Sequence, residues 1–143
     1  MPAARTPLRV AAATLVAAVA IQFVPVKRDN PPVTSEVDAP PDVKAILERS
    51  CYDCHSNRTR WPWYSRVAPV SWLVAWDVRR GRDELNFTEW PAFDFEEQED
   101  HLDRAAKMVD RQKMPLPIYV LMHGDARLSV EQRRRLVNWA RGE

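Results

Sequence analysis

Apolar residues are gathered first in one run near the N-terminus. Val10 to Val24 is almost entirely apolar and follows the basic residues Arg5 and Arg9. Such a run is typical of an exported protein, either as a cleaved signal peptide or as a retained membrane anchor. The small-residue triplet at 18–20 lies inside the run and not after it, which favours the anchor. We therefore predict that residues 1–24 are a signal peptide or a membrane anchor, and both interpretations stay open.

The following segment, residues 25–41, is rich in proline and has no apolar period. Proline fixes the backbone dihedral φ and removes a hydrogen-bond donor, so an extended and semi-rigid linker is expected. Residues 42–143 then form the predicted domain, which the linker would hold a short distance from a membrane.

Helical patterns begin the domain. Val43, Ile46 and Leu47 have the spacing of one helix face, and the same stripe continues to Cys51. The first helix therefore brings a cysteine onto its buried face.

A second helix is predicted to start near Val70. We expect it to end near Gly81, because a glycine often follows the C-terminus of a helix.

Two further helices carry capping boxes, in which two side chains satisfy the first free N–H groups of a helix. These pairs are Asp94 with Glu97, and Ser129 with Gln132. Residues 114–128 are predicted to be a loop. Because no alternating strand pattern of useful length is present, we predict an all-α domain of about four helices with long, aromatic-rich loops. Long loops in a small protein need a reason to stay ordered, and a large apolar cofactor would supply one.

The composition of the chain argues against several classes of fold and function. The chain has 143 residues and a formal net charge of +1, which gives no basic field for nucleic acid. Only three glycines stand against twelve prolines, which argues against a β-sandwich or a phosphate-binding loop. Six tryptophans indicate a bulky aromatic wall, and two cysteines are too few for a disulfide framework.

The two cysteines belong to the motif Cys51-Tyr52-Asp53-Cys54-His55. Two thiols on one short turn can each form a thioether with a haem vinyl group, while the next imidazole reaches the iron. The motif therefore predicts one covalent haem c, with Cys51 and Cys54 as the tethers and His55 as the proximal iron ligand.

Other functions of a cysteine pair fit this sequence less well. A thioredoxin-like pair would need a βαβ context. A structural zinc site would need four ligands, and no second cysteine pair follows. A disulfide that closes so short a loop would be strained and would stabilise little.

The second axial ligand has several candidates. Met114 is preferred, because it precedes Pro115 in a loop that can bring its sulfur to the iron. Met122, the two histidines His101 and His123, and an open sixth position remain as alternatives. Met108 is interpreted as core filling in the third helix.

Aromatic residues cluster shortly after the motif. Trp61, Trp63 and Tyr64 are predicted to line the haem pocket, with simple core filling as the competing interpretation. A nearby arginine, Arg60 or Arg66, would then meet a haem propionate.

Longer motifs surround these residues. They are Asn30-Pro31-Pro32-Val33, Ser50 to Asn57, Trp61-Pro62-Trp63-Tyr64, Ala68-Pro69-Val70-Ser71-Trp72, Leu85-Asn86-Phe87, Met114-Pro115 with Tyr119, and Asp125-Ala126-Arg127-Leu128-Ser129. Over residues 30 to 141 the chain resembles the bacterial haem-binding domain family, and it is similar to class I c-type cytochromes. The resemblance implies a monohaem, mostly helical, cytochrome c-like periplasmic protein. Leu116 and Pro117 depart from it, because a second proline is expected beside the first.

The preferred function is electron transfer by a haem that His55 and Met114 ligate, without a transformed substrate. The alternative is a haem enzyme of peroxidase type, or a gas or redox sensor, with a weak or open sixth position. The expected partners are a redox protein and the inner membrane, reached through the N-terminal segment, with no nucleic acid. The expected location is the periplasmic side of the bacterial inner membrane, anchored there or released after signal cleavage.

Overall fold

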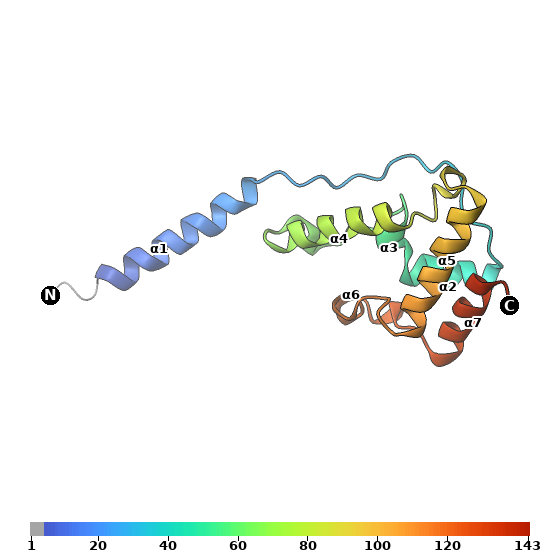
Figure 1. Ribbon diagram of the computed structural model, residues 1–143. Coiled ribbons are helices and arrows are strands. Elements are labelled where there is room, and N and C mark those ends of the chain that lie inside the picture. Colours follow the sequence, from blue (N-terminus) through green and yellow to red (C-terminus); the bar gives the residue numbers. More distant parts are fainter. Residues whose placement is uncertain (1–4) are drawn as a thin grey trace. The chain divides into compact units, whose positions relative to one another are not determined.

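A computed structural model gives the fold of this protein and describes residues 5–143. Within this range the structure contains helices and no strand, and one isolated bridge joins Ser35 to Glu89. The α-helices are α1 (Arg5–Ala20), α2 (Pro41–Ser50), α3 (Tyr52–His55), α4 (Val70–Glu84), α5 (Phe95–Asp110), α6 (Pro117–Met122) and α7 (Val130–Arg141) (Figure 1). Short 3₁₀ turns are η1 (Ile21–Phe23), η2 (Trp63–Arg66), η3 (Trp90–Ala92) and η4 (Gly124–Ala126). The prediction of an all-α protein is confirmed.

The N-terminal helix is apolar and its side chains are exposed. Thr6–Phe23 is long and apolar enough to cross a membrane. A helix of its 18 residues is about 27 Å long, close to the thickness of a hydrocarbon core. Its large apolar side chains, such as Leu15 at 66% exposure, contact solvent and not a protein core. These properties agree with the predicted signal peptide or anchor.

The chain forms two compact units. The first unit contains the residues up to Arg28 and Trp61–Trp76, and the second contains Asp29–Arg60 and Asp77–Glu143. In the first unit the Gln22 amide exchanges two hydrogen bonds with the backbone of Ala68, at 2.9 and 3.1 Å. Arg28 also donates to the carbonyl oxygen of Ser65. These bonds fix the end of the apolar helix to the segment that carries the aromatic residues.

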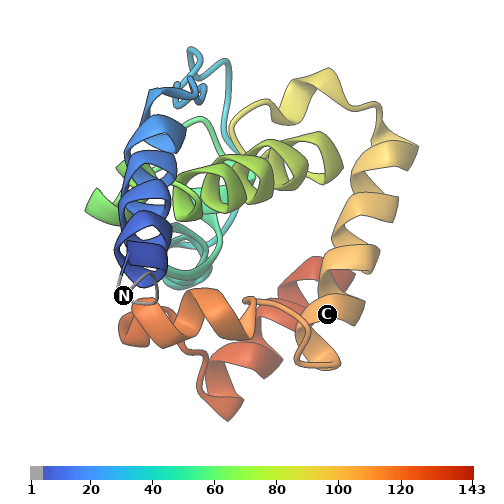
Figure 2. The same cartoon turned by 90° about the vertical axis from the view of Figure 1, so that its left-hand side faces the viewer.

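The second unit has a hydrophobic core that four helices share. Helix α5 packs against α7, and α2 contacts both α3 and α7 (Figures 1 and 2). Val43, Ile46 and Leu47 are buried in this core, as the helical stripe in the sequence predicts. Cys51, the next member of that stripe, packs against the same core and is half-buried.

Helix starts agree with the capping predictions. The Asp94 side chain accepts from the Glu97 backbone N–H while the Glu97 side chain accepts from the Asp94 N–H, and α5 begins at the next residue. Ser129 and Gln132 make the same pair of bonds at the start of α7. Both predicted capping boxes are confirmed.

Two predicted boundaries are wrong. Helix α4 does not end near Gly81 but continues to Glu84, so Gly81 is an interior helix residue. The predicted loop 114–128 contains a helix, α6. Pro117 stands at its first position, where the missing N–H group and the fixed φ of proline favour a helix start.

The predicted linker makes specific contacts from Asp29 onward. The Val37 N–H donates to the carbonyl oxygen of Phe87 over 2.8 Å, and the Thr34 N–H donates to that of Thr88 over 3.1 Å. Val37 is buried in the core of the second unit. This part of the proline-rich segment therefore lies along residues 85–89.

Candidate functional site

The cysteine motif occupies the turn between α2 and α3. The Cys51 N–H donates to the carbonyl oxygen of Leu47, which ends α2. The carbonyl oxygen of Cys51 then accepts from the N–H groups of Cys54 at 3.1 Å and His55 at 2.9 Å. The structure thus brings the three predicted motif residues together on one helical turn.

The imidazole of His55 is oriented by the end of α4. Its Nδ1 atom lies 2.9 Å from the carbonyl oxygen of Gly81 and 3.1 Å from that of Leu85. Because both neighbours are acceptors, Nδ1 carries the proton and Nε2 keeps its lone pair. Burial lowers the pKa of His55, although the two backbone hydrogen bonds oppose this effect. The ring is therefore held neutral, with Nε2 available to bind a metal ion.

The backbone of α4 approaches the motif closely at Gly81. A Cβ atom at Gly81 would lie 2.5 Å from the carbonyl oxygen of Cys54 and 3.1 Å from its Cβ. No real side chain fits in such a space. Glycine is thus required here for contact between α4 and the motif, and not as the end of the helix.

The two thiols are free and protonated. Both cysteines are half-buried and unpaired in the structure. Burial raises the pKa of each thiol to about 12, and the neighbouring charges of Asp77 and Asp53 add to the effect on Cys54. A thiol–disulfide enzyme needs the opposite, a thiolate stabilised at neutral pH. The thioredoxin-like interpretation therefore finds no support in this geometry.

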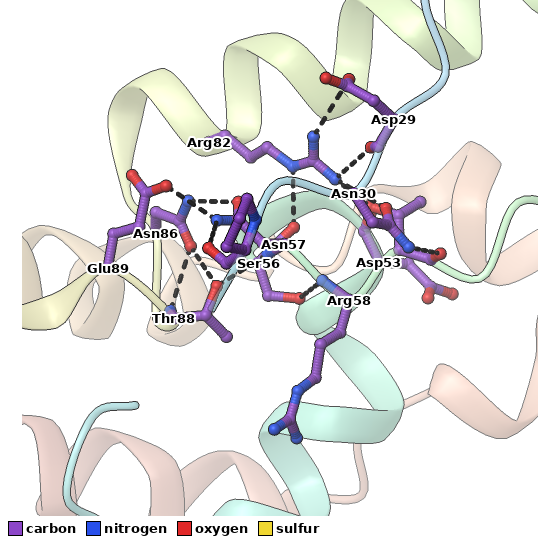
Figure 3. Close-up of polar contacts among 12 residues, drawn as sticks. Asp29, Asn30, Asp53, Ser56, Asn57, Arg58, Arg82, Asn86, Thr88 and Glu89 are labelled. Atoms are coloured by element: carbon purple, nitrogen blue, oxygen red, sulfur yellow. Dashed lines mark hydrogen bonds and ion pairs between the residues drawn. The ribbon is translucent and has the colours of Figure 1, made fainter. Parts of the chain in front are cut away.

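A buried polar network supports the segment that follows the motif (Figure 3). The Asn86 amide donates to Asn57 Oδ1 over 2.9 Å, and the Thr88 hydroxyl donates to Asn86 Oδ1 over 2.8 Å. The Asn57 N–H donates to the Thr88 hydroxyl over 2.8 Å, which closes the network. The Phe87 N–H, between these residues, donates to the carbonyl oxygen of His55 over 2.9 Å. Residues 85–88 thus hold His55 through both its backbone and its ring.

Arg82 joins three parts of the second unit. Its guanidinium donates to the carbonyl oxygen of Ser56 over 2.8 Å and to the Thr59 hydroxyl over 2.9 Å. It also donates to the carbonyl oxygen of Asp29 and to Asn30 Oδ1, each over 3.1 Å (Figure 3). Helix α4, the loop after the motif and the proline-rich segment are therefore fixed by one side chain.

Asp53, between the two cysteines, is also hydrogen-bonded. It is 7% exposed, and its carboxylate accepts from the Arg60 N–H and guanidinium. The Tyr119 hydroxyl of α6 donates to Asp53 Oδ2 over 2.7 Å. The motif is thus linked to a helix from late in the chain.

The candidates for a distal ligand lie in different surroundings. Met114 is half-buried and packs against the core that also contacts Cys51. Met108 and Met122 are 40% and 55% exposed. His101 contacts the ring of Phe93, with 4.4 Å between centroids. His123 stacks on Tyr119. Met114 as the distal ligand stays a prediction.

The predicted aromatic residues lie in the first unit. Trp63 and Tyr64 contact each other edge to face, with 5.8 Å between ring centroids. Trp63 is 74% exposed, whereas Trp61 and Tyr64 are half-buried. Their assignment to a haem pocket stays a prediction.

Three functional features were not found from the sequence. The contact at Gly81 could have been suspected, because a glycine inside a helical pattern often marks close packing. The Asn57–Asn86–Thr88 network and the Asp53–Tyr119 bond join residues far apart in the chain, and no local pattern indicates them.

The residues around the motif fit a haem group. Two free thiols and a neutral imidazole with an available Nε2 lie on one turn, and Gly81 keeps the neighbouring helix backbone against it. A structural zinc site fits less well, because within residues 5–143 no group of three or more His, Cys, Asp or Glu side chains could hold a metal ion. Cys51, Cys54 and His55 are the residues that would hold the haem.

Comparison with known proteins agrees with this site. A family model described as a haem-binding domain matches residues 16–142, which is most of the chain. No curated protein and no solved structure matches. The matched range includes the motif, the residues that orient His55, and α6. The chain therefore belongs to the haem-binding domain family.

Proposed function

We propose that this protein is an exported monohaem c-type cytochrome that transfers electrons. One observation carries the proposal: the Nδ1 atom of His55 is fixed by the carbonyl oxygens of Gly81 and Leu85, beside two free thiols on the same turn. This arrangement leaves Nε2 for iron and sets its direction. A disulfide enzyme would not need a histidine oriented in this way, and a zinc site would need a further group of His, Cys, Asp or Glu ligands that residues 5–143 do not offer.

Cys51 and Cys54 would attach the haem covalently. Each thiol adds across one vinyl group, so that sulfur bonds to one vinyl carbon and the thiol hydrogen passes to the other. The addition consumes no oxidant or reductant. Since the pKa of both thiols is raised, they stay protonated and resist oxidation to a disulfide until they react.

Met114 is proposed as the distal ligand. Of the three methionines considered, Met108 and Met122 are exposed, whereas Met114 packs on the same core as Cys51. When bound, haem iron cycles between its ferric and ferrous states by one electron, and a His/Met pair raises its reduction potential. His55 and Met114 would be the two protein ligands of the iron, and iron with two protein ligands suits electron transfer and not substrate chemistry.

The N-terminal helix supports export. Thr6–Phe23 would serve as a signal peptide or as an anchor in the inner membrane, with the haem-binding unit on the periplasmic side. The partner would be a redox protein that gives or takes one electron.

The test is the spectrum of the purified full-length protein together with its intact mass. We expect a haem stain that survives denaturation, reversible reduction, and in the ferric form a weak band at about 695 nm that is typical of Met ligation. A Cys51→Ser/Cys54→Ser variant should lose the stain. Covalent haem without this band, combined with rapid binding of carbon monoxide, would favour a haem enzyme or gas sensor. Absence of covalent haem would overturn the proposal.

A further inference from the structure

We propose that Asp53 and Tyr119 form a tether that holds the segment after Met114 against the haem-attachment turn, and thereby sets how firmly Met114 binds iron. The inference rests on the proposed function, because it takes Met114 as the distal ligand. Tyr119 is a positioning residue, since it acts on the iron only through Met114.

The anchor point is the carboxylate of Asp53. This residue lies between the two motif cysteines and is 7% exposed. Oδ1 accepts from the Arg60 N–H over 3.0 Å and from Arg60 Nε over 3.2 Å. The charge is thus compensated, and the carboxylate is held in one orientation. A fixed buried acceptor next to Cys54 is therefore available to a donor from elsewhere in the chain.

Tyr119 supplies that donor. Its hydroxyl lies 2.7 Å from Asp53 Oδ2, although the two residues are 66 positions apart. Hydrogen bonds between a hydroxyl and a carboxylate are short and about twice as strong as bonds between neutral groups. The bond thus joins α6 directly to the residue between the cysteines.

Helix α6 depends on this bond because little apolar burial holds it. None of its residues is buried. Ile118, Leu121 and Met122 are 57%, 79% and 55% exposed, whereas Tyr119 is half-buried. A six-residue helix is too short to be stable alone.

Helix α6 restrains Met114 from its C-terminal side, while the Met114 N–H, which donates to the carbonyl oxygen of Met108 over 3.2 Å, restrains it from the side of α5. The helix begins at Pro117, and the Val120 N–H donates to the carbonyl oxygen of Leu116, so the chain from Leu116 onward moves with α6. Only Pro115, with its fixed φ, separates Leu116 from Met114. Loss of the tether would therefore remove the restraint on the C-terminal side of Met114 and weaken its bond to the iron.

The stack between Tyr119 and His123 does not replace the tether. The ring centroids lie 4.2 Å apart, and His123 Nδ1 lies 3.2 Å from the carbonyl oxygen of Tyr119. Both contacts stay within α6 and the residue after it. They order the end of the helix but do not join it to the motif.

The test compares Tyr119→Phe with the wild-type full-length holoprotein. Phenylalanine keeps the ring and removes only the donor. We expect a weaker band at about 695 nm, a lower reduction potential, and carbon monoxide binding to the ferrous form about tenfold faster, because Met114 leaves the iron more often. Tyr119→Phe in the background of Asp53→Asn should have a smaller effect than in wild type, as a double-mutant cycle requires for a direct pair.

Leu121→Ala is the matched control. Leu121 lies on the same helix as Tyr119, and its side chain is 79% exposed. Its removal should leave the band, the potential and the carbon monoxide rate unchanged. Haem content and the thermal midpoint are measured on every variant, so that loss of the fold is recognised. If Tyr119→Phe does not fold, Asp53→Asn is compared with wild type instead. We then expect a partial loss of the band at about 695 nm, and an unchanged band would overturn the tether.

The outcomes separate this inference from the proposed function. Met ligation in wild type with the same spectrum, potential and carbon monoxide rate in Tyr119→Phe would overturn the tether and leave the cytochrome proposal intact. A wild-type protein that holds covalent haem but lacks Met ligation would overturn the distal-ligand assignment and the tether with it. A wild-type protein without covalent haem would overturn the proposed function.

Discussion

Gly81 and Cys54 lie so close that a Cβ atom at Gly81 would stand 2.5 Å from the carbonyl oxygen of Cys54. The contact is between the backbone of α4 and the backbone of the cysteine motif, so neither side can give way by a change of rotamer. The carbonyl group of the same glycine accepts from the His55 ring. Contact between backbones and orientation of the His55 ring are thus combined in one residue.

The first prediction concerns Gly81→Ala. In an exposed helix interior, alanine would stabilise by up to about 1 kcal/mol over glycine. At Gly81 we expect the reverse, a loss of about 1–3 kcal/mol of unfolding free energy, because the added methyl group overpacks a rigid contact. The measurements are denaturant unfolding and haem content.

Gly124→Ala is the control for this change. A Cβ atom there would meet nothing within 4 Å. Its effect should stay within about 0.5 kcal/mol, as for most surface substitutions. Equal stability of the two variants would contradict the proposed role of Gly81.

The second prediction concerns Thr88→Val, which keeps the side-chain shape and removes the hydroxyl. Thr88 is 0% exposed, and its hydroxyl both donates to Asn86 and accepts from the Asn57 N–H. Two buried polar groups would lose a partner, so we expect a loss of about 2 kcal/mol in unfolding free energy. Thr34→Val is the control: Thr34 is exposed in the proline-rich segment and its hydroxyl makes one long bond, to the carbonyl oxygen of Thr88 over 3.3 Å, so this change should alter stability by less than about 0.5 kcal/mol.

The third prediction concerns Arg82→Lys. Lysine keeps the charge, but its single ammonium group cannot donate at once to Ser56, Thr59 and the proline-rich segment, as the guanidinium does. We expect a loss of about 2 kcal/mol, measured by denaturant unfolding. Arg79→Lys, at an exposed position of the same helix, should be neutral. A neutral result at Arg82 as well would show that its contacts do not contribute to stability.

The fourth prediction concerns pH. A hydrogen bond from Arg135 lowers the pKa of Asp42 below its ordinary value of 3.8. A depressed folded-state pKa gives stability that is present above pH 3.8 and is lost as the pH falls through the folded value. Wild type should therefore be more stable than Asp42→Asn at neutral pH, and the difference should shrink below pH 3.8.

High salt should also reduce this difference, because the pair lies at the surface. Asp38→Asn removes the same charge from another exposed position and serves as the control. The measurement is urea unfolding at neutral and acidic pH. A wild-type advantage that persists at acidic pH would exclude the Asp42–Arg135 pair as its source.

Features encoded locally could be predicted from the sequence. The capping boxes at Asp94 and Ser129 were predictable because their partners lie three residues on, within the same turn. The buried stripe through Val43 and Leu47 follows from helix periodicity alone. The motif from Cys51 to His55 is also contained in one turn.

Features that depend on tertiary contact were missed or misread. Gly81 has the composition signal of a helix end, but its neighbour in space is Cys54, which no local pattern indicates. Helix α6 was predicted as loop, because a short helix with exposed apolar residues lacks an amphipathic pattern. Its link to Asp53 spans 66 positions.

The end of α4 has a consequence for local unfolding. Every α-helix leaves its last carbonyl groups without partners inside the helix, and a glycine after the C-terminus often helps to satisfy them. At the end of α4 the carbonyl oxygen of Gly81 accepts from the Leu85 N–H over 3.0 Å, and the His55 ring adds bonds to this oxygen and to that of Leu85. His55 is thus bonded to the last turn of this helix and to the residue that follows it. Fraying of the last turn of α4 would break the bonds that orient His55, so we expect amide exchange at the end of α4 to report on how firmly this imidazole is held.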